Sequence, residues 1–139
     1  LTSCASQLKA DVASGVVLTS DDQYYVVRRF GDEHGVGELI RDSLRRRGRA
    51  AECGEETEMP DGTDILVRYQ DEWQWDLSWF LLSLEVRFLD PVTAAVMASA
   101  TNQRSSLARK SKEVMVEESL EAIFEKNSSD APVSKGPNP

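Results

Sequence analysis

The sequence predicts an α/β (α+β) domain. A single, mostly antiparallel sheet of about four to five strands is expected to carry two helices on one face, in the order β-α-β-β-β-α. Two kinds of pattern predict this fold. Residues 79–89 alternate with the period of a strand, whereas 36–47 and 112–126 repeat apolar residues at helical spacing. A chain of 139 residues is long enough for one domain with a substantial core.

The chain divides into a tether at 1–14, the α/β domain at 15–126 and a C-terminal tail at 127–139. The tail has no core-forming residues, so we expect it to be disordered. Turn-forming and acidic residues separate the elements of the domain. We expect a short strand at 15–18, further strands at 23–30, 49–53, 65–70, 79–89 and 94–101, and helices at 36–47 and 112–126.

Each predicted helix has an apolar stripe and a polar face. The stripe of the first is Val36, Leu39, Ile40 and Leu44, and that of the second is Val116, Leu120, Ile123 and Phe124. Arginines at 45–47 suit the negative end of the first helix dipole, and Gly48 suits its C-terminal cap. Ser111 is placed to cap the start of the second helix.

Residues 79–89 form the clearest strand. One face carries Phe80, Leu82, Leu84, Val86 and Phe88, and we expect this face to be core. The other carries Trp79, Leu81, Ser83, Glu85 and Arg87, and it becomes polar along the strand. A strand with one polar face favours an antiparallel sheet covered by helices on one side. We expect it to form a hairpin with 94–101.

Composition excludes several functions. The formal net charge of −8 disfavours nucleic acid as a partner, because the surface repels phosphate. The glycine pattern GDEHGVG at 31–37 matches neither a P-loop nor a dinucleotide-binding loop, and we predict no cofactor. One histidine and two cysteines predict no metal site, and His34 is interpreted as an ordinary surface histidine. A disulfide bond between Cys4 and Cys53 is a remaining alternative if the compartment is oxidising.

The candidate binding surface is a cluster of aromatic and acidic residues before the central strand: Tyr69, Asp71, Glu72, Trp73, Trp75, Asp76 and Trp79. Exposed aromatic side chains are frequent hot spots of protein contacts, and rings beside carboxylates also suit a glycan. Two alternatives stay open. The aromatic residues could simply cover the sheet, or Asp71, Glu72 and Asp76 could supply the paired acids of a glycoside hydrolase. No nucleophile motif is present, so we predict no catalytic residues.

The chain begins LTSC, which resembles the lipobox of bacterial lipoproteins, and residues 1–14 are therefore interpreted as a lipobox remnant and tether. The resemblance implies that Cys4 carries lipid and that a signal peptide has been removed. Acyl chains would anchor the protein to a membrane. No aspartate follows Cys4, which by the sorting rule of that group implies the outer membrane, with the domain facing the periplasm.

The chain resembles small lipoproteins of Gram-negative envelopes in five segments: LTSC at the start, YYVVRRF at 24–30, a helix ending RRRG, the block from Ile65 to Asp90 and KSKEVMVEESLEAIF at 110–124. These lipoproteins include some that assist exopolysaccharide export. The resemblance implies a non-enzymatic binding or assembly module of the cell envelope, with a membrane, an envelope protein or a glycan as partner. The alternatives are a small glycan-directed hydrolase and a ring-forming, homo-oligomeric subunit of a polysaccharide export complex.

Overall fold

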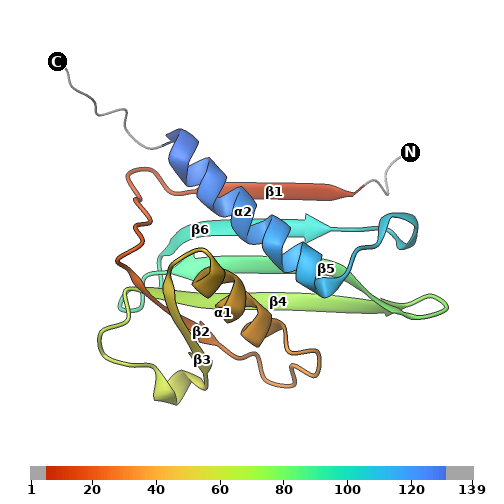
Figure 1. Cartoon of the computed structure of the whole chain (residues 1–139), viewed down its shortest axis with the longest axis horizontal. Coiled ribbons are helices and arrows are strands. Elements are labelled where there is room, and N and C mark those ends of the chain that lie inside the picture. The colour runs from red at the N-terminus through yellow and green to blue at the C-terminus, as the bar shows by residue number, and fades with distance from the viewer. Residues whose placement is uncertain (1–5, 131–139) are drawn as a thin grey trace.

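In the computed structural model, residues 6–130 are described, and they form one six-stranded sheet with two helices on the same face (Figure 1). The elements are β1 (Gln7–Val12), β2 (Gln23–Val27), α1 (Val36–Arg46), β3 (Ala50–Gly54), β4 (Ile65–Trp75), β5 (Trp79–Leu89), β6 (Val96–Gln103) and α2 (Lys112–Asp130). Two short 3-10 helices, η1 (Glu56–Glu58) and η2 (Ser106–Ala108), lie in the connections. None of the helices in the described part of the chain is both long and apolar enough to span a membrane.

The strand order is β1-β6-β5-β4-β2-β3, so both edge strands come from the first half of the chain. Four neighbouring strands, β1, β6, β5 and β4, are antiparallel. Strand β2 runs parallel to both of its neighbours, β3 and β4, and α1 makes the crossover between β2 and β3. The predicted single sheet with two helices on one face is confirmed, but the sheet has six strands and is mixed.

The core lies between the sheet and the two helices. Its fully buried members include Val36, Ile40 and Leu44 of α1 and Met115, Leu120 and Ile123 of α2, packed on Val67, Val86 and Phe88 of the sheet. A smaller cluster of Tyr25, Val27, Leu66 and Leu89, with Met59 against it, lies apart from this main core. The apolar stripes predicted for the two helices therefore identify the buried faces correctly.

The N-terminal strand is displaced from its predicted position. Residues 15–18, expected as a strand, belong to a loop, whereas β1 lies within the segment expected to be a tether. Strand β1 pairs antiparallel with β6, from Gln7 opposite Gln103 to Val12 opposite Ala98. The prediction was wrong because the partner of this strand lies about 90 residues further along the chain, where local patterns carry no information.

Helix α2 is longer than predicted. It continues through Asp130, past the expected end at 126. Asn127 is buried, and its side chain accepts a hydrogen bond from the backbone amide of Leu18 (3.2 Å) and donates one to the carbonyl of Val16 (2.8 Å). This amide side chain therefore ties the last turns of α2 to the loop after β1. Residues 131–139 of the predicted tail lie outside the described residues.

A β-bulge in β5 changes which side chains reach the core. Glu72 of β4 pairs with Ser83 and Trp73 pairs with Leu81, so Leu82 is the extra residue. The bulge shifts the alternation by one position. As a result, Leu81 belongs to the main core. Leu82, predicted to be a core residue on the face of Leu84, is only half-buried, whereas Phe80 is buried as predicted but lies outside the main cluster.

Candidate functional site

The seven residues of the predicted binding surface do not form one site. Strand β4 extends through Trp75, past the predicted strand at 65–70, and forms a long hairpin with β5. Tyr69 and Asp71 are buried, Trp73 is half-buried, and the other four are exposed: Glu72, Trp75, Asp76 and Trp79. The structure therefore separates a buried polar network from an exposed hairpin tip, with Trp73 between them.

Asp71 is a structural carboxylate. Its side chain is 0% exposed, Oδ1 accepts a hydrogen bond from Nε of Arg29 (2.7 Å), and Oδ2 accepts one from the indole Nε1 of Trp73 (2.8 Å). Both oxygens are therefore occupied, as buried charge requires. The bond from Trp73 to Asp71 holds the indole ring in one orientation, and the ion pair between Asp71 and Arg29 joins β4 to the segment that follows β2.

Tyr69 and Asp32 extend this network to the start of α1. The Tyr69 hydroxyl donates to Oδ2 of Asp32 (2.5 Å) and accepts from the backbone amide of Arg29 (2.9 Å). Asp32 also accepts from the backbone amides of His34, Val36 and Gly37, at 3.0–3.2 Å. A carboxylate in this position satisfies the free amides of the first helical turn.

The electrostatics follow from these contacts. Burial on its own raises the pKa of Asp32, but the hydrogen bonds from Tyr69 and from three backbone amides outweigh it and hold that pKa below its usual value. Burial, together with the hydrogen bond to Asp32, raises the pKa of Tyr69. Both groups therefore keep their ordinary charge states near neutral pH and act as a fixed support.

The three acids considered for glycoside hydrolysis are not brought together. Asp71 is fully enclosed, Glu72 lines a separate polar pocket with Gln74 and Gln103, and Asp76 is exposed at the hairpin tip, where Arg109 contacts it (3.5 Å). Paired acids must face one bond across a defined gap. This arrangement provides no such pair. Within residues 6–130 there is also no group of three histidine, cysteine or acidic side chains that could hold a metal ion.

His34 differs from the ordinary surface histidine that we predicted. It is half-buried, and its ring stacks on Trp73 with the ring centroids 3.6 Å apart and the planes 17° from parallel. Asp71 orients Trp73 through the indole nitrogen, and Asp32 fixes the backbone at His34. The two rings therefore form a face-to-face stack, which covers their inner faces and leaves only the outer faces available, and each ring has its own support. We call this stacked pair the aromatic platform.

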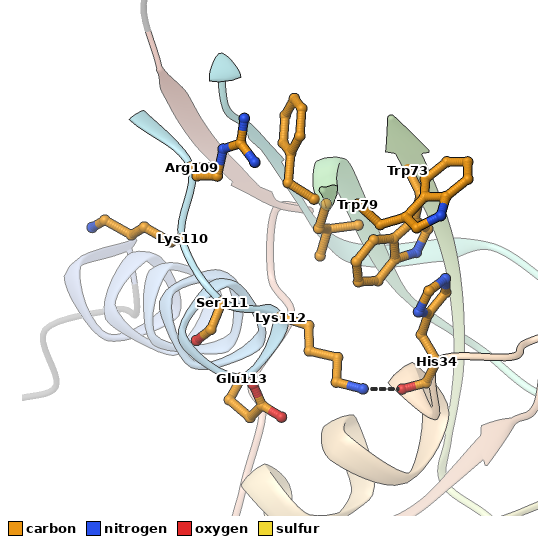
Figure 2. Close-up of a pocket in the computed structure, with 10 residues that line it drawn as sticks. His34, Trp73, Trp79, Arg109, Lys110, Ser111, Lys112 and Glu113 are labelled. Atoms are coloured by element: carbon orange, nitrogen blue, oxygen red, sulfur yellow. Dashed lines mark hydrogen bonds between the residues drawn. The ribbon is translucent and has the colours of Figure 1, made fainter. Parts of the chain in front are cut away.

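This platform forms part of the wall of a pocket of about 490 Å³ (Figure 2). The lining residues are His34, Trp73, Trp79, Phe80, Leu81, Arg109, Lys110, Ser111, Lys112 and Glu113. Figure 2 shows the aromatic rings on one side and the chain from Arg109 to Glu113 on the other. The pocket thus lies where the β4–β5 hairpin, the start of α1 and the start of α2 meet.

Positive charge dominates the pocket although the chain carries −8 overall. Three cationic side chains and one carboxylate line it. Nζ of Lys112 donates to the backbone carbonyl of His34 (2.6 Å), an uncharged acceptor (Figure 2). Lys110 and Arg104 share the single carboxylate of Glu118, at 2.5 and 2.6 Å. The sequence reasoning missed this feature, although the basic run RKSK at 109–112 in an acidic chain was a signal for it.

The hairpin tip beside the pocket is apolar and exposed. Trp75 and Trp79 are 60% and 61% exposed and meet edge to face, with centroids 5.7 Å apart. Leu77 at the turn is almost fully exposed. Leu107 after β6 is also exposed and lies toward the same end of the sheet, because Gln103 pairs with Ser83 and Ser83 pairs with Glu72. Phe30 after β2 is exposed too, but β2 pairs with β4 only as far as Val67, well before the hairpin tip. An apolar set of this kind marks a contact surface.

The two cysteines are not equivalent in what the structure describes. Cys53 is a free, half-buried thiol, and burial raises its pKa to about 11. Cys4, the predicted lipid attachment site, lies outside the described residues. The bridge between them considered above stays a prediction.

Comparison with known proteins finds a fold and no sequence family. No protein-family model matches the chain, and no curated protein matches it. Among solved structures, the PelC dodecamer from Paraburkholderia phytofirmans matches with a TM-score of 0.63 and 16% identity, covering 88% of this chain and 96% of that one. A point variant of the same dodecamer, solved in another crystal form, matches equally well, with 97% of its chain covered. The chain therefore has a fold similar to that of a PelC subunit.

Proposed function

We propose that this protein is a non-enzymatic, ring-forming subunit of a polysaccharide export complex in the cell envelope. The observation that carries the proposal is the fold match to PelC, which is a dodecamer and whose chain is matched almost from end to end. The resemblance of the sequence to lipoproteins that assist exopolysaccharide export points the same way.

The surface of the chain is compatible with assembly. A closed ring requires two different patches on each subunit that fit one another. The two ends of the sheet order are unlike: β1 is packed under α2, whereas β3 is a short edge strand next to α1 and the acidic η1. The three acids considered for hydrolysis, Asp71, Glu72 and Asp76, are in contrast not brought together. Assembly is therefore better supported than hydrolysis.

The test is the mass of the native particle over a range of concentrations. Light scattering and native mass spectrometry should give one species that is a fixed multiple of the 15.5 kDa chain and larger than a dimer, and electron microscopy should show closed rings. A monomer at every concentration, with and without the lipid, would refute the proposal. Growth into open filaments would refute closure.

For the cellular location, we propose that lipid on Cys4 anchors the protein to the outer membrane, with the domain in the periplasm. Strand β1 begins opposite Gln103, at the end of the sheet that carries the exposed tryptophans. Three residues of chain span at most about 10 Å, so lipid on Cys4 would hold this apolar end close to the bilayer. Tryptophan side chains are favoured at such interfaces. Metabolic labelling with palmitate and membrane fractionation test this, with Cys4→Ser as control, and a Cys4 protein that is unlabelled and soluble would contradict it.

A further inference from the structure

We infer that the pocket between His34, Trp73, Trp79 and Lys112 binds an acidic saccharide, a sugar ring that carries a carboxylate. This inference deepens the proposed function and rests on it for the source of the saccharide, an acidic polymer that passes through the complex. The binding itself is a property of one subunit and is measured separately from assembly.

The aromatic platform provides the surface for the sugar ring. The weakly positive C–H bonds of a pyranose face are attracted to the negative face of an aromatic ring. The rings of His34 and Trp73 are stacked, with their centroids 3.6 Å apart and their planes 17° from parallel, so a sugar would pack on an outer face of the stack. Asp71 and Asp32 hold the stack in place before any ligand arrives. The adjacent wall is Trp79, which is 61% exposed. A site organised in advance loses little conformational entropy on binding.

The cations opposite the platform select an acidic ligand. Lys112 is held 2.6 Å from the carbonyl of His34, so its ammonium group lies at the edge of the platform with its charge uncompensated by that bond. Arg109 lies over the ring of Phe80 (4.4 Å) and pairs with Asp76 (3.5 Å), and Lys110 shares the carboxylate of Glu118 with Arg104. Four cations, Arg104, Arg109, Lys110 and Lys112, therefore face three acids, Asp76, Glu113 and Glu118, and Lys112 carries the excess positive charge. A carboxylate entering beside the platform would therefore meet net positive charge, and a neutral or cationic sugar would gain nothing from it.

The size of the pocket fits one or two sugar units. Small-molecule sites usually measure about 300–1,000 Å³ and combine apolar walls with a few placed polar groups. This pocket, at about 490 Å³, has aromatic walls on one side and the hydroxyl of Ser111 with three cations on the other. That hydroxyl already accepts from the amide of Val114 (3.2 Å), so the cations, and not the start of the helix, provide the recognition.

Calorimetric titration with trigalacturonate, an acidic trisaccharide, tests the inference. Maltotriose serves as the neutral probe, a chitosan trimer as the cationic probe and inorganic phosphate as a simple anion. We expect trigalacturonate to bind and the other three to bind at least about tenfold more weakly, and the tryptophan fluorescence to change on binding. Equal binding of maltotriose or of phosphate, or no binding of trigalacturonate, would overturn the inference.

Two pairs of variants separate the roles of charge and ring. Lys112→Met should weaken trigalacturonate binding about three- to tenfold, and Lys9→Met, which removes an exposed lysine of β1 outside the pocket, should leave it unchanged. Trp79→Leu should weaken it similarly, whereas Phe30→Leu should not, since Phe30 is also an exposed aromatic residue (98%) but does not line the pocket. Equal effects within either pair would contradict the site.

The same samples distinguish this inference from the proposed function. None of the substituted side chains belongs to the hydrophobic core, and circular dichroism on heating checks that each variant is folded. Native mass is measured beside each titration. Saccharide binding by a monomer would refute the ring and leave the pocket standing, whereas a ring that binds no acidic saccharide would refute the pocket alone.

Discussion

Replacing Arg29 by methionine would leave the carboxylate of Asp71 buried without its cationic partner. The Asp71 side chain is 0% exposed, and Arg29 Nε lies 2.7 Å from its Oδ1. Breaking a buried pair on one side usually costs about 3–5 kcal/mol. Because Arg29 is itself 30% exposed and the indole of Trp73 still donates to Asp71, we expect a smaller loss, about 2–3 kcal/mol of unfolding free energy.

Urea unfolding followed by tryptophan fluorescence measures this loss. For a chain of this size the midpoint should fall by about 1–2 M, with the slope unchanged. Arg41→Met is the matched control: Arg41 binds Asp42 in a more exposed pair (27% and 41%), so its loss should cost at most about 1 kcal/mol. Protein concentration is kept constant because assembly also stabilises.

The double variant Arg29→Met with Asp71→Leu completes the cycle. Removing both charges replaces the pair by apolar side chains of similar size, which is often close to neutral. We expect the double variant to be more stable than Arg29→Met alone. If Arg29→Met costs no more than the Arg41 control, or if the two single losses simply add, then the buried pair does not support the platform as described.

Three further predictions follow from the same packing. Gly37→Ala places a Cβ 2.7 Å from the Tyr69 hydroxyl, so it should lower the unfolding free energy by about 1–3 kcal/mol in urea, whereas Gly62→Ala, with nothing within 4 Å, should change it by less than about 0.5 kcal/mol. The low pKa of Asp32 gives stability that is fully present above the usual aspartate pKa, about 4, and is lost as the pH falls through the lower folded value. The advantage of the native protein over Asp32→Asn should therefore be constant from about pH 7 to about pH 5 and shrink below about pH 4, and a difference that stays constant down to about pH 2 would contradict this. Because burial raises the pKa of Cys53 to about 11, iodoacetamide should alkylate it at about pH 8 roughly 100-fold more slowly than a free thiol. Mass spectrometry on a variant whose other cysteine is serine measures the rate. A rate equal to that of a free thiol would refute the burial.

The helices and the central hairpin strands were predictable because their signals are local. Val36, Ile40 and Leu44 repeat at helical spacing, and the buried stripe of α1 contains these residues. The strand from 79 to 89 alternates over eleven residues, and β5 has the same bounds. A period of 3.6 or 2 needs only the neighbouring residues to be recognised.

Features that depend on distant partners were missed. Strand β1 exists because β6 offers an open edge about 90 residues later, and the bulge at Leu82 depends on how β5 meets β4. A bulge of one residue moves side chains to the opposite face, and no periodicity within the strand reveals where it occurs. The structure alone showed that Leu81 is core.

The candidate site divides in the same way. Residue types alone marked these side chains as candidates for a site, because tryptophans and acids crowded between Tyr69 and Trp79 are unusual wherever they occur. Their roles depend on the fold. It buried Asp71 against Trp73, brought His34 onto that ring, and placed Lys112 opposite, from a helix that begins almost 40 residues later. The physical reason is that the types of neighbouring residues can be read directly from the sequence, whereas a pocket is made by contacts between segments far apart in the chain.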